Sequence, residues 1–135
     1  LPSDDEIAAT FGELSESERL FGEGAPERIA SIRANGALYD TLLEHCESLT
    51  STPLGAALRV AETFRALGEK VGDAMKIGNR QGNAEVLRIL GIWWSSRGPG
   101  RDHGLDWIAE SHRYVIGNAN SGLVFDALFA RLLAL

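Results

Sequence analysis

Several features that mark common classes of protein are scarce or missing in this sequence of 135 residues. Its single cysteine, Cys46, has no partner for an intrachain disulfide, which excludes a disulfide-stapled secreted scaffold. The longest apolar runs, residues 90–94 and 132–135, are far too short to cross a bilayer, which needs about 20 residues. A basic amino-terminal region followed by an apolar run, the mark of a secretory signal, is also missing. We therefore expect a cytoplasmic domain that has no membrane partner.

Positive charge is in short supply as well. Thirteen basic residues stand against nineteen acidic ones, so the formal net charge is −6. Binding to a nucleic-acid backbone needs clustered positive charge, and this composition argues against direct contact with DNA or RNA. The apolar fraction of 44% and the charged fraction of 24% are those of an average globular protein, which predicts a single packed core. Because the chain starts at Leu1 rather than Met, we expect it to be a piece of a longer protein.

Apolar residues recur at helical spacing along the chain, and no segment shows the alternation of a strand. The pattern predicts an all-α fold, an orthogonal or irregular bundle of about five to six helices. The segment from residue 69 to residue 83 is ambiguous, because Gly72, Gly78 and Gly82 each cost up to about 1 kcal/mol in a helix interior. We predict a helix with a weak or broken middle there, and a long loop over residues 98–104. The other predicted helices cover residues 3–14, 16–21, 26–34, 37–49, 54–68, 84–97, 105–116 and 123–135.

Two clusters contain the residue types of a catalytic or metal site. Asp106 and Glu110 share a helix face, but His112 points away from it, so a solvated helix face competes with a metal-assisted hydrolase. His45 and Cys46 are adjacent, and helical neighbours point about 100° apart, so the histidine is badly placed to act as a base for the thiol. We expect Cys46 to be a core residue, and we expect no catalytic residue, no metal and no cofactor.

The three tryptophans carry the strongest functional signal. Trp93 and Trp94 are adjacent, so one helix is not expected to direct both into a single core. One of them would then meet a second helix layer, a ligand pocket or another chain. Aromatic residues and arginine are enriched at the centres of protein interfaces, so our candidate partner interface is Trp93, Trp94, Arg97 and Trp107. The alternative is a binding module for a small apolar ligand, with Tyr114 and the tryptophans as pocket walls.

Three segments resemble, in the same order, the carboxy-terminal region of bacterial clamp-loader subunits. Residues 23–29 are similar to the turn and helix start Gly-Ser-x-x-Arg-Ala, and residues 86–97 to an apolar helix that often carries a Trp. Asn118-x-Asn120, followed by Leu123, Ala127, Leu128 and Leu132, resembles the Asn-x-Asn-Pro turn and closing helix of the delta-prime subunit. The chain departs from this pattern at residues 121–122, where Ser-Gly replaces the Pro, and at the glycines within residues 72–82.

This resemblance implies that residues 22–135 are a collar domain of the delta-prime family of the DNA polymerase III clamp loader. Residues 1–21 would then end a preceding small helical lid domain or form an amino-terminal helix. In that family, the collar domains of five subunits pack side by side into a ring. The implied role is a non-catalytic scaffold in DNA replication. Its implied partners are other clamp-loader subunits in a hetero-oligomer, which would meet DNA only through the complex.

Overall fold

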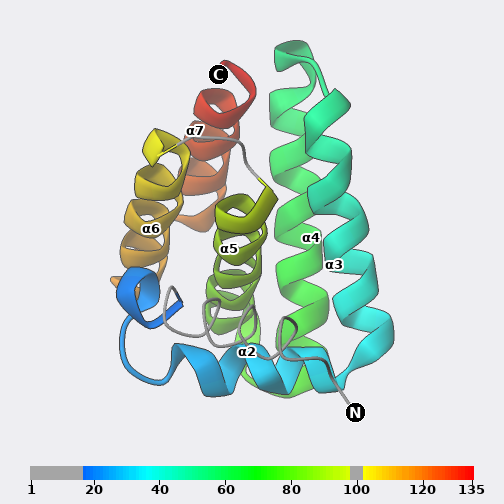
Figure 1. Ribbon diagram of the computed structural model, residues 1–135, viewed down its shortest axis with the longest axis vertical. Helices are drawn as coiled ribbons and strands as arrows, with labels where there is room; N and C mark the ends of the chain where they lie inside the picture. The colour runs from blue at the N-terminus through cyan, green and yellow to red at the C-terminus, as the bar shows by residue number, and fades with distance from the viewer. Residues whose placement is uncertain (1–16, 98–101) are drawn as a thin grey trace.

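The computed structural model describes residues 17–97 and 102–135, and this part of the chain consists of helices and short connections without a strand (Figure 1). Residues 17–21 are helical, and the predicted helix over residues 3–14 lies outside the described residues. The α-helices that follow are α2 (Ala25–Ala34), α3 (Gly36–Ser48), α4 (Ala57–Met75), α5 (Gly78–Arg97), α6 (Asp102–Ile116) and α7 (Ser121–Leu133). Two short 3₁₀ turns, Leu49–Ser51 and Leu54–Ala56, connect α3 to α4. The all-α prediction is confirmed.

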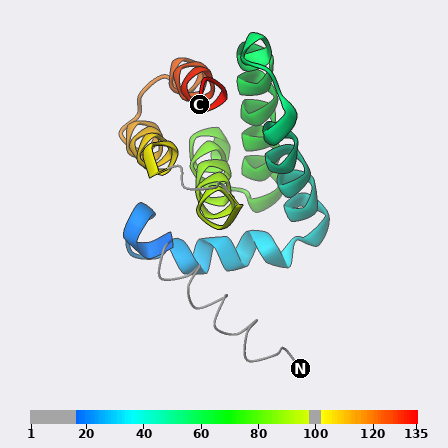
Figure 2. The same cartoon turned by 45° about the horizontal axis from the view of Figure 1, so that its top comes forward.

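The helices form an antiparallel bundle with one transverse member. From α3 to α7 the chain runs alternately up and down, and α2 crosses the end of the bundle (Figures 1 and 2). Contacts join α4 to α5, α5 to α6, α6 to α7 and α7 back to α4, so these four helices form a closed ring. Helix α3 packs outside that ring against α4 and α5, and α2 packs against α3 and α5.

Helix α5 is surrounded by its neighbours along most of its length. Every residue from Gly82 to Trp94 is buried, so α5 has no solvent face over more than three turns. Its apolar side chains meet Phe64 and Val71 of α4, Ile108 of α6, and Leu42 of α3 in one continuous core. A helix that is buried all round has little amphipathic pattern, and the sequence of α5 shows this because apolar, glycine and charged residues follow one another without a clear polar face.

The glycines between residues 68 and 82 bring α4 and α5 into close contact. An ideal Cβ at Gly82 would lie 2.0 Å from the backbone oxygen of Gly68, and one at Gly72 would lie 2.5 Å from that of Gly78. Only residues without a side chain allow backbones to approach so closely. The predicted break between residues 69 and 83 is confirmed, but Gly72 and Gly82 lie inside the two helices and do not cause it. Helix α4 continues to Met75, Lys76 ends it in the left-handed conformation (φ 59°), and α5 begins at Gly78.

Other predicted boundaries shift by a turn or less. Asn35 is the C-cap of α2, as its Asn-Gly context predicts. Helix α6 starts at Asp102, so the predicted loop is too long at its carboxyl end, while residues 98–101 lie outside the described residues. Phe21 lies in the segment predicted to end a preceding lid domain or to form an amino-terminal helix, and its ring packs against Gly91 and His112 of the bundle. The described part of that segment therefore shares the core of residues 22–135. No helix within the described ranges is long and apolar enough to cross a membrane.

Substituting Gly82→Ala tests the close crossing of α4 and α5. The added methyl group meets backbone rather than a movable side chain, so we expect a loss of about 1–3 kcal/mol in the free energy of unfolding, measured by chemical denaturation. Gly36→Ala is the matched control, because a Cβ there meets nothing within 4 Å and its stability should be unchanged or slightly raised. Equal stability of the two variants would contradict the crossing.

Candidate functional site

The structure buries two of the four predicted interface residues. Trp93 and Trp94 are 4% and 3% exposed, so the expectation that one helix cannot direct both into a core is wrong. The physical reason is the central position of α5, whose opposite faces are covered by different helices. Gly104 in the first turn of α6 makes room for the Trp94 indole, because a Cβ there would lie 2.4 Å from its Nε1. The two indoles also contact each other edge to face, with ring centroids 6.1 Å apart.

The other two predicted interface residues lie elsewhere. Arg97 is the last residue of α5, and its side chain is outside the described part of the structure. Trp107 lies on the outer side of α6 and is partly exposed. The Arg131 guanidinium of α7 lies over its ring, 5.8 Å from the centroid, and the ring of His103 stacks nearby at 6.2 Å. Trp107 is thus the predicted residue that remains available to a partner.

Trp107 belongs to a surface that we call the α6–α7 face. The residues that α6 contributes to this face are three or four positions apart, so they share one side of the helix. On α7, Leu123, Ala127 and Arg131 follow at four-residue spacing and are exposed. The carboxylate of Glu110 lies 3.8 Å from Arg131, which joins the two rows. The α6–α7 face consists of His103, Trp107, Glu110 and Tyr114 from α6 together with Leu123, Ala127 and Arg131 from α7.

This face exposes large apolar side chains. Leu123 is 70% exposed and Tyr114 is 53% exposed. A single exposed leucine is ordinary, but aromatic rings and an arginine on one face match the composition of protein interface centres. The spacing of the α6 row was readable from the sequence, but its pairing with α7 depends on the antiparallel packing of the two helices, which the sequence pattern did not fix.

A second unusual feature is a buried ionic cluster that the sequence analysis missed. Glu85 and Arg88, one turn apart on α5, form an ion pair, and both side chains are almost completely buried. Arg28 of α2 reaches the same Glu85 oxygen at 3.3 Å. Burial lowers the pKa of Arg88, an effect that Glu85 opposes. Two charged residues inside the predicted helix over residues 84–97 were the available signal, because charged groups are seldom buried without a partner.

His112 joins this cluster as a neutral group. Its ring is 5% exposed and packs edge to face against Phe21, with centroids 4.9 Å apart. Burial lowers its pKa from the ordinary value near 6.5 to about 4, and the positive charges of Arg88, Arg113 and Arg28 act in the same direction. The structure therefore directs His112 into the bundle, whereas Asp106 and Glu110 are on the outer side of α6. Within the described ranges, no three potential ligands gather into a metal-binding group.

Cys46 occupies the core position that the sequence predicts. It is 1% exposed, and burial raises the pKa of its thiol to about 12, with a smaller contribution from Glu47. A thiol with so high a pKa is protonated at neutral pH and is a poor nucleophile. His45 packs instead against Phe64, with ring centroids 6.2 Å apart.

The aromatic residues do not surround one ligand cavity. Trp93 and Trp94 border a cavity of about 100 Å³ together with residues of the connection between α3 and α4 and of the carboxyl end of the chain, residues 132–135. Trp107 and Tyr114 are not among its lining residues. Sites for small molecules usually measure about 300–1,000 Å³. This cavity is smaller than that, which argues against a pocket for a small apolar ligand.

Comparison of the chain with protein-family models, with curated proteins and with solved structures found no match in any of the three.

Arg88→Met tests whether the buried Glu85 carboxylate depends on Arg88 for its stability in the core. Removing the arginine leaves the Glu85 charge buried beside only the half-exposed Arg28, and we expect a loss of about 3–5 kcal/mol in stability. The double variant Glu85→Leu/Arg88→Met removes both charges and should recover most of that loss. Denaturant titration of the two variants measures the difference. A double variant less stable than the single one would contradict this description.

His112→Leu tests the neutral buried imidazole. Below pH 6.5 the unfolded state gains a proton that folded His112 does not take up until about pH 4. Folding stability therefore falls as the pH decreases through this window, by about 3 kcal/mol from this residue alone. The free energy of unfolding of His112→Leu should therefore fall less between pH 7 and pH 4 than that of the unaltered chain, measured by denaturation at each pH. The exposed His103→Gln is the control and should keep the profile of the unaltered chain. Identical profiles for all three proteins would contradict a neutral His112.

Proposed function

We propose that this chain is a non-catalytic helical scaffold domain that assembles with other clamp-loader subunits into the collar ring during DNA replication. The observation that carries the proposal is the α6–α7 face, an exposed aromatic and arginine-containing surface on two packed helices. The resemblance of residues 23–29, 86–97 and 118–132 to clamp-loader collars supplies the identity of the partners. The ring would be a hetero-oligomer in the cytoplasm.

The α6–α7 face has the properties of a preformed docking surface. The Trp107 ring contacts both His103 and Arg131, and Arg131 also pairs with Glu110. Side chains that are ordered before binding lose less conformational entropy when a partner arrives. Leu123, two turns before Arg131 along the same row of α7, gives additional apolar area for a partner to cover.

The charge of the chain fits a position away from nucleic acid. A net charge of −6 disfavours direct contact with a phosphate backbone, so we propose that the domain meets DNA only through the assembled complex. The scaffold would need no cofactor. Its contribution to the complex would be to hold neighbouring subunits in a fixed arrangement.

Two substitutions on the α6–α7 face test this role. Trp107→Ala and Leu123→Ser should each weaken association with the collar domains of the other clamp-loader subunits by about tenfold or more, measured by calorimetry. Leu123→Ser should leave thermal stability nearly unchanged, because the side chain it removes is 70% exposed.

Leu58→Ser is the matched control for Leu123→Ser. Leu58 is a leucine of similar exposure, 67%, at the other end of the bundle near the start of α4 (Figure 1). The Leu58→Ser variant should bind the other collar domains with the affinity of the unaltered chain. The proposal is overturned if the unaltered chain does not associate with any clamp-loader collar, or if Leu58→Ser and Leu123→Ser weaken association equally.

A further inference from the structure

Residues 17–34, which we call the α2 cover, lie across the bundle and outside the ring formed by α4, α5, α6 and α7 (Figure 2). Helix α2 packs against α3 and α5, and the short helical segment before it reaches α5 and α6 through Phe21. Ala25, Ile29 and Ile32 of α2 are buried in the same core. The cover is therefore attached to the bundle mainly by apolar side chains along one side.

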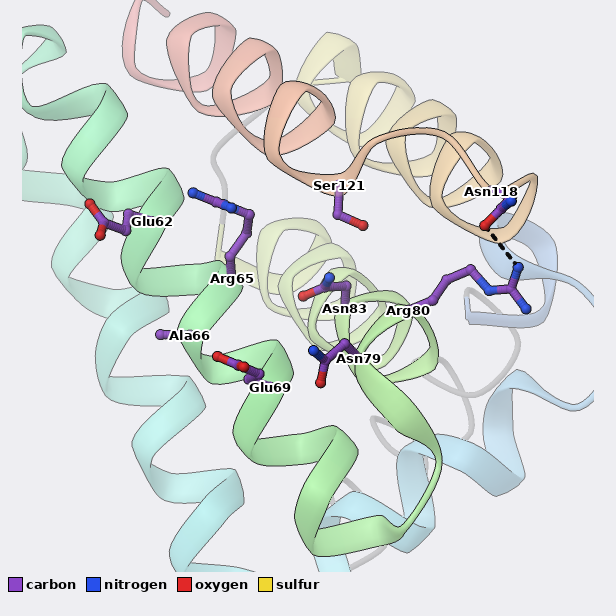
Figure 3. A pocket seen from close by; sticks show the side chains of 9 residues that line it. All are labelled: Glu62, Arg65, Ala66, Glu69, Asn79, Arg80, Asn83, Asn118 and Ser121. Carbon is purple, nitrogen blue, oxygen red and sulfur yellow. Dashed lines mark hydrogen bonds between the residues drawn. The ribbon is translucent and has the colours of Figure 1, made fainter.

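The ring of four helices is held together by contacts in which the cover takes no part. Figure 3 shows the place where α4, the first turns of α5 and the connection between α6 and α7 meet. There Arg80 of α5 donates a hydrogen bond from Nη1 to Oδ1 of Asn118 at 3.2 Å. Gly68 and Gly82 bring the backbones of α4 and α5 together on the same side of the ring. None of these contacts needs residues 17–34.

The surface beneath the cover is polar although it is buried. Glu85 and Arg88 of α5 and His112 of α6 are almost completely buried there. The cover touches them through Arg28, 3.3 Å from Glu85, and through Phe21, whose ring packs against His112. Glu85 Oε2, Arg88 Nε and His112 Nε2 have no hydrogen-bond partner among the described residues. Because water would bond to each of these atoms, their burial opposes closure of the cover.

Two opposing contributions thus determine how firmly the cover is closed. Burial of Phe21, Ile29 and Ile32 favours the closed state, while burial of the charged pair and the imidazole opposes it. Between α4 and α7, by contrast, the rings of Phe64 and Phe129 pack against each other with centroids 4.7 Å apart. Parts of a protein that gain little from closing open at a lower free energy than the whole domain.

We propose that the α2 cover opens as a unit while α4, α5, α6 and α7 stay folded, and that its opening exposes Glu85, Arg88 and His112 to solvent. The cover is a conformational device that controls access to this ionic cluster. The α6–α7 face contains none of residues 17–34. This inference therefore does not depend on the assembly of the chain with other subunits, and either proposal stands if the other fails.

The connection between α2 and α3 is the hinge of this movement. Asn35 is the last cap of α2 and the first cap of α3, and its backbone angles (φ −93°, ψ 79°) belong to neither helix. The following residue, Gly36, is exposed, and a Cβ on it would meet nothing within 4 Å. Residues at the ends of elements are the ones that absorb the change of backbone angles in a hinge movement.

Native-state hydrogen exchange of the unaltered chain, followed by nuclear magnetic resonance, tests the proposal. The cover amides, those of Ile29 and Ile32, are compared with the ring amides of Phe64 and Leu128. After correction for intrinsic rates, the cover amides should exchange about a hundredfold or more faster, because they exchange without global unfolding. The two cover amides should be equally protected, because one opening exposes both. Equal protection of all four amides would overturn the proposal, and so would a large difference between Ile29 and Ile32.

Two variants test what the opening exposes. Arg88→Met leaves the Glu85 charge without its main partner only while the cover is closed, so exchange of the cover amides should become about a hundredfold faster or more. Gly82→Ala is the matched control, because it weakens the α4–α5 crossing, which persists when the cover opens. It should speed exchange of the ring amides and leave the cover amides unchanged. Unchanged cover amides in Arg88→Met, or equal acceleration of all amides in Gly82→Ala, would overturn the proposal.

Discussion

The enclosure of α5 is the constraint on which the rest of this structure depends. A helix that is buried on every side from Gly82 to Trp94 needs neighbours on all of its faces, and α3, α4, α6 and the transverse α2 supply them. The glycines of α4 and α5 allow one of these contacts to be made backbone against backbone, and Gly104 of α6 admits Trp94 on another side. Since α5 also carries Glu85 and Arg88, the same enclosure forces an ion pair into the interior, where it is stabilised by Arg28.

This enclosure also decides where a partner can bind. Trp93 and Trp94 stabilise the interior of the chain itself, so the candidate partner surface lies on α6 and α7, the two helices farthest from α3 (Figure 2). On that side, Trp107 is supported by Arg131 from the adjacent helix and lies on the same face as Leu123. The proposed scaffold role thus rests on a surface made by α6 and α7, which α5 and α4 support from the other side.

The amino-acid sequence predicted the helices well and their surroundings poorly. Periodicity located most helices because apolar spacing follows from the geometry of a single element. It misjudged Gly72 and Gly82, because a glycine that breaks a helix and a glycine that admits a neighbouring backbone look the same in one sequence. The interior place of Trp93 and Trp94 was missed for a related reason, since the number of neighbours around a helix is a property of the whole fold. Asn83 and His112 are polar, and only the packing of other helices shows that they are buried.

Hydroxyl-radical footprinting of the tryptophans, on the chain alone and mixed with the other clamp-loader collar domains, tests the central claim most directly. The account predicts that Trp107 is oxidised in the free chain and protected in the assembly, while Trp93 and Trp94 react slowly in both. Rapid oxidation of Trp93 or Trp94 in the free chain would contradict the enclosure of α5. Unchanged oxidation of Trp107 in a mixture that has demonstrably assembled would contradict the role of the α6–α7 face.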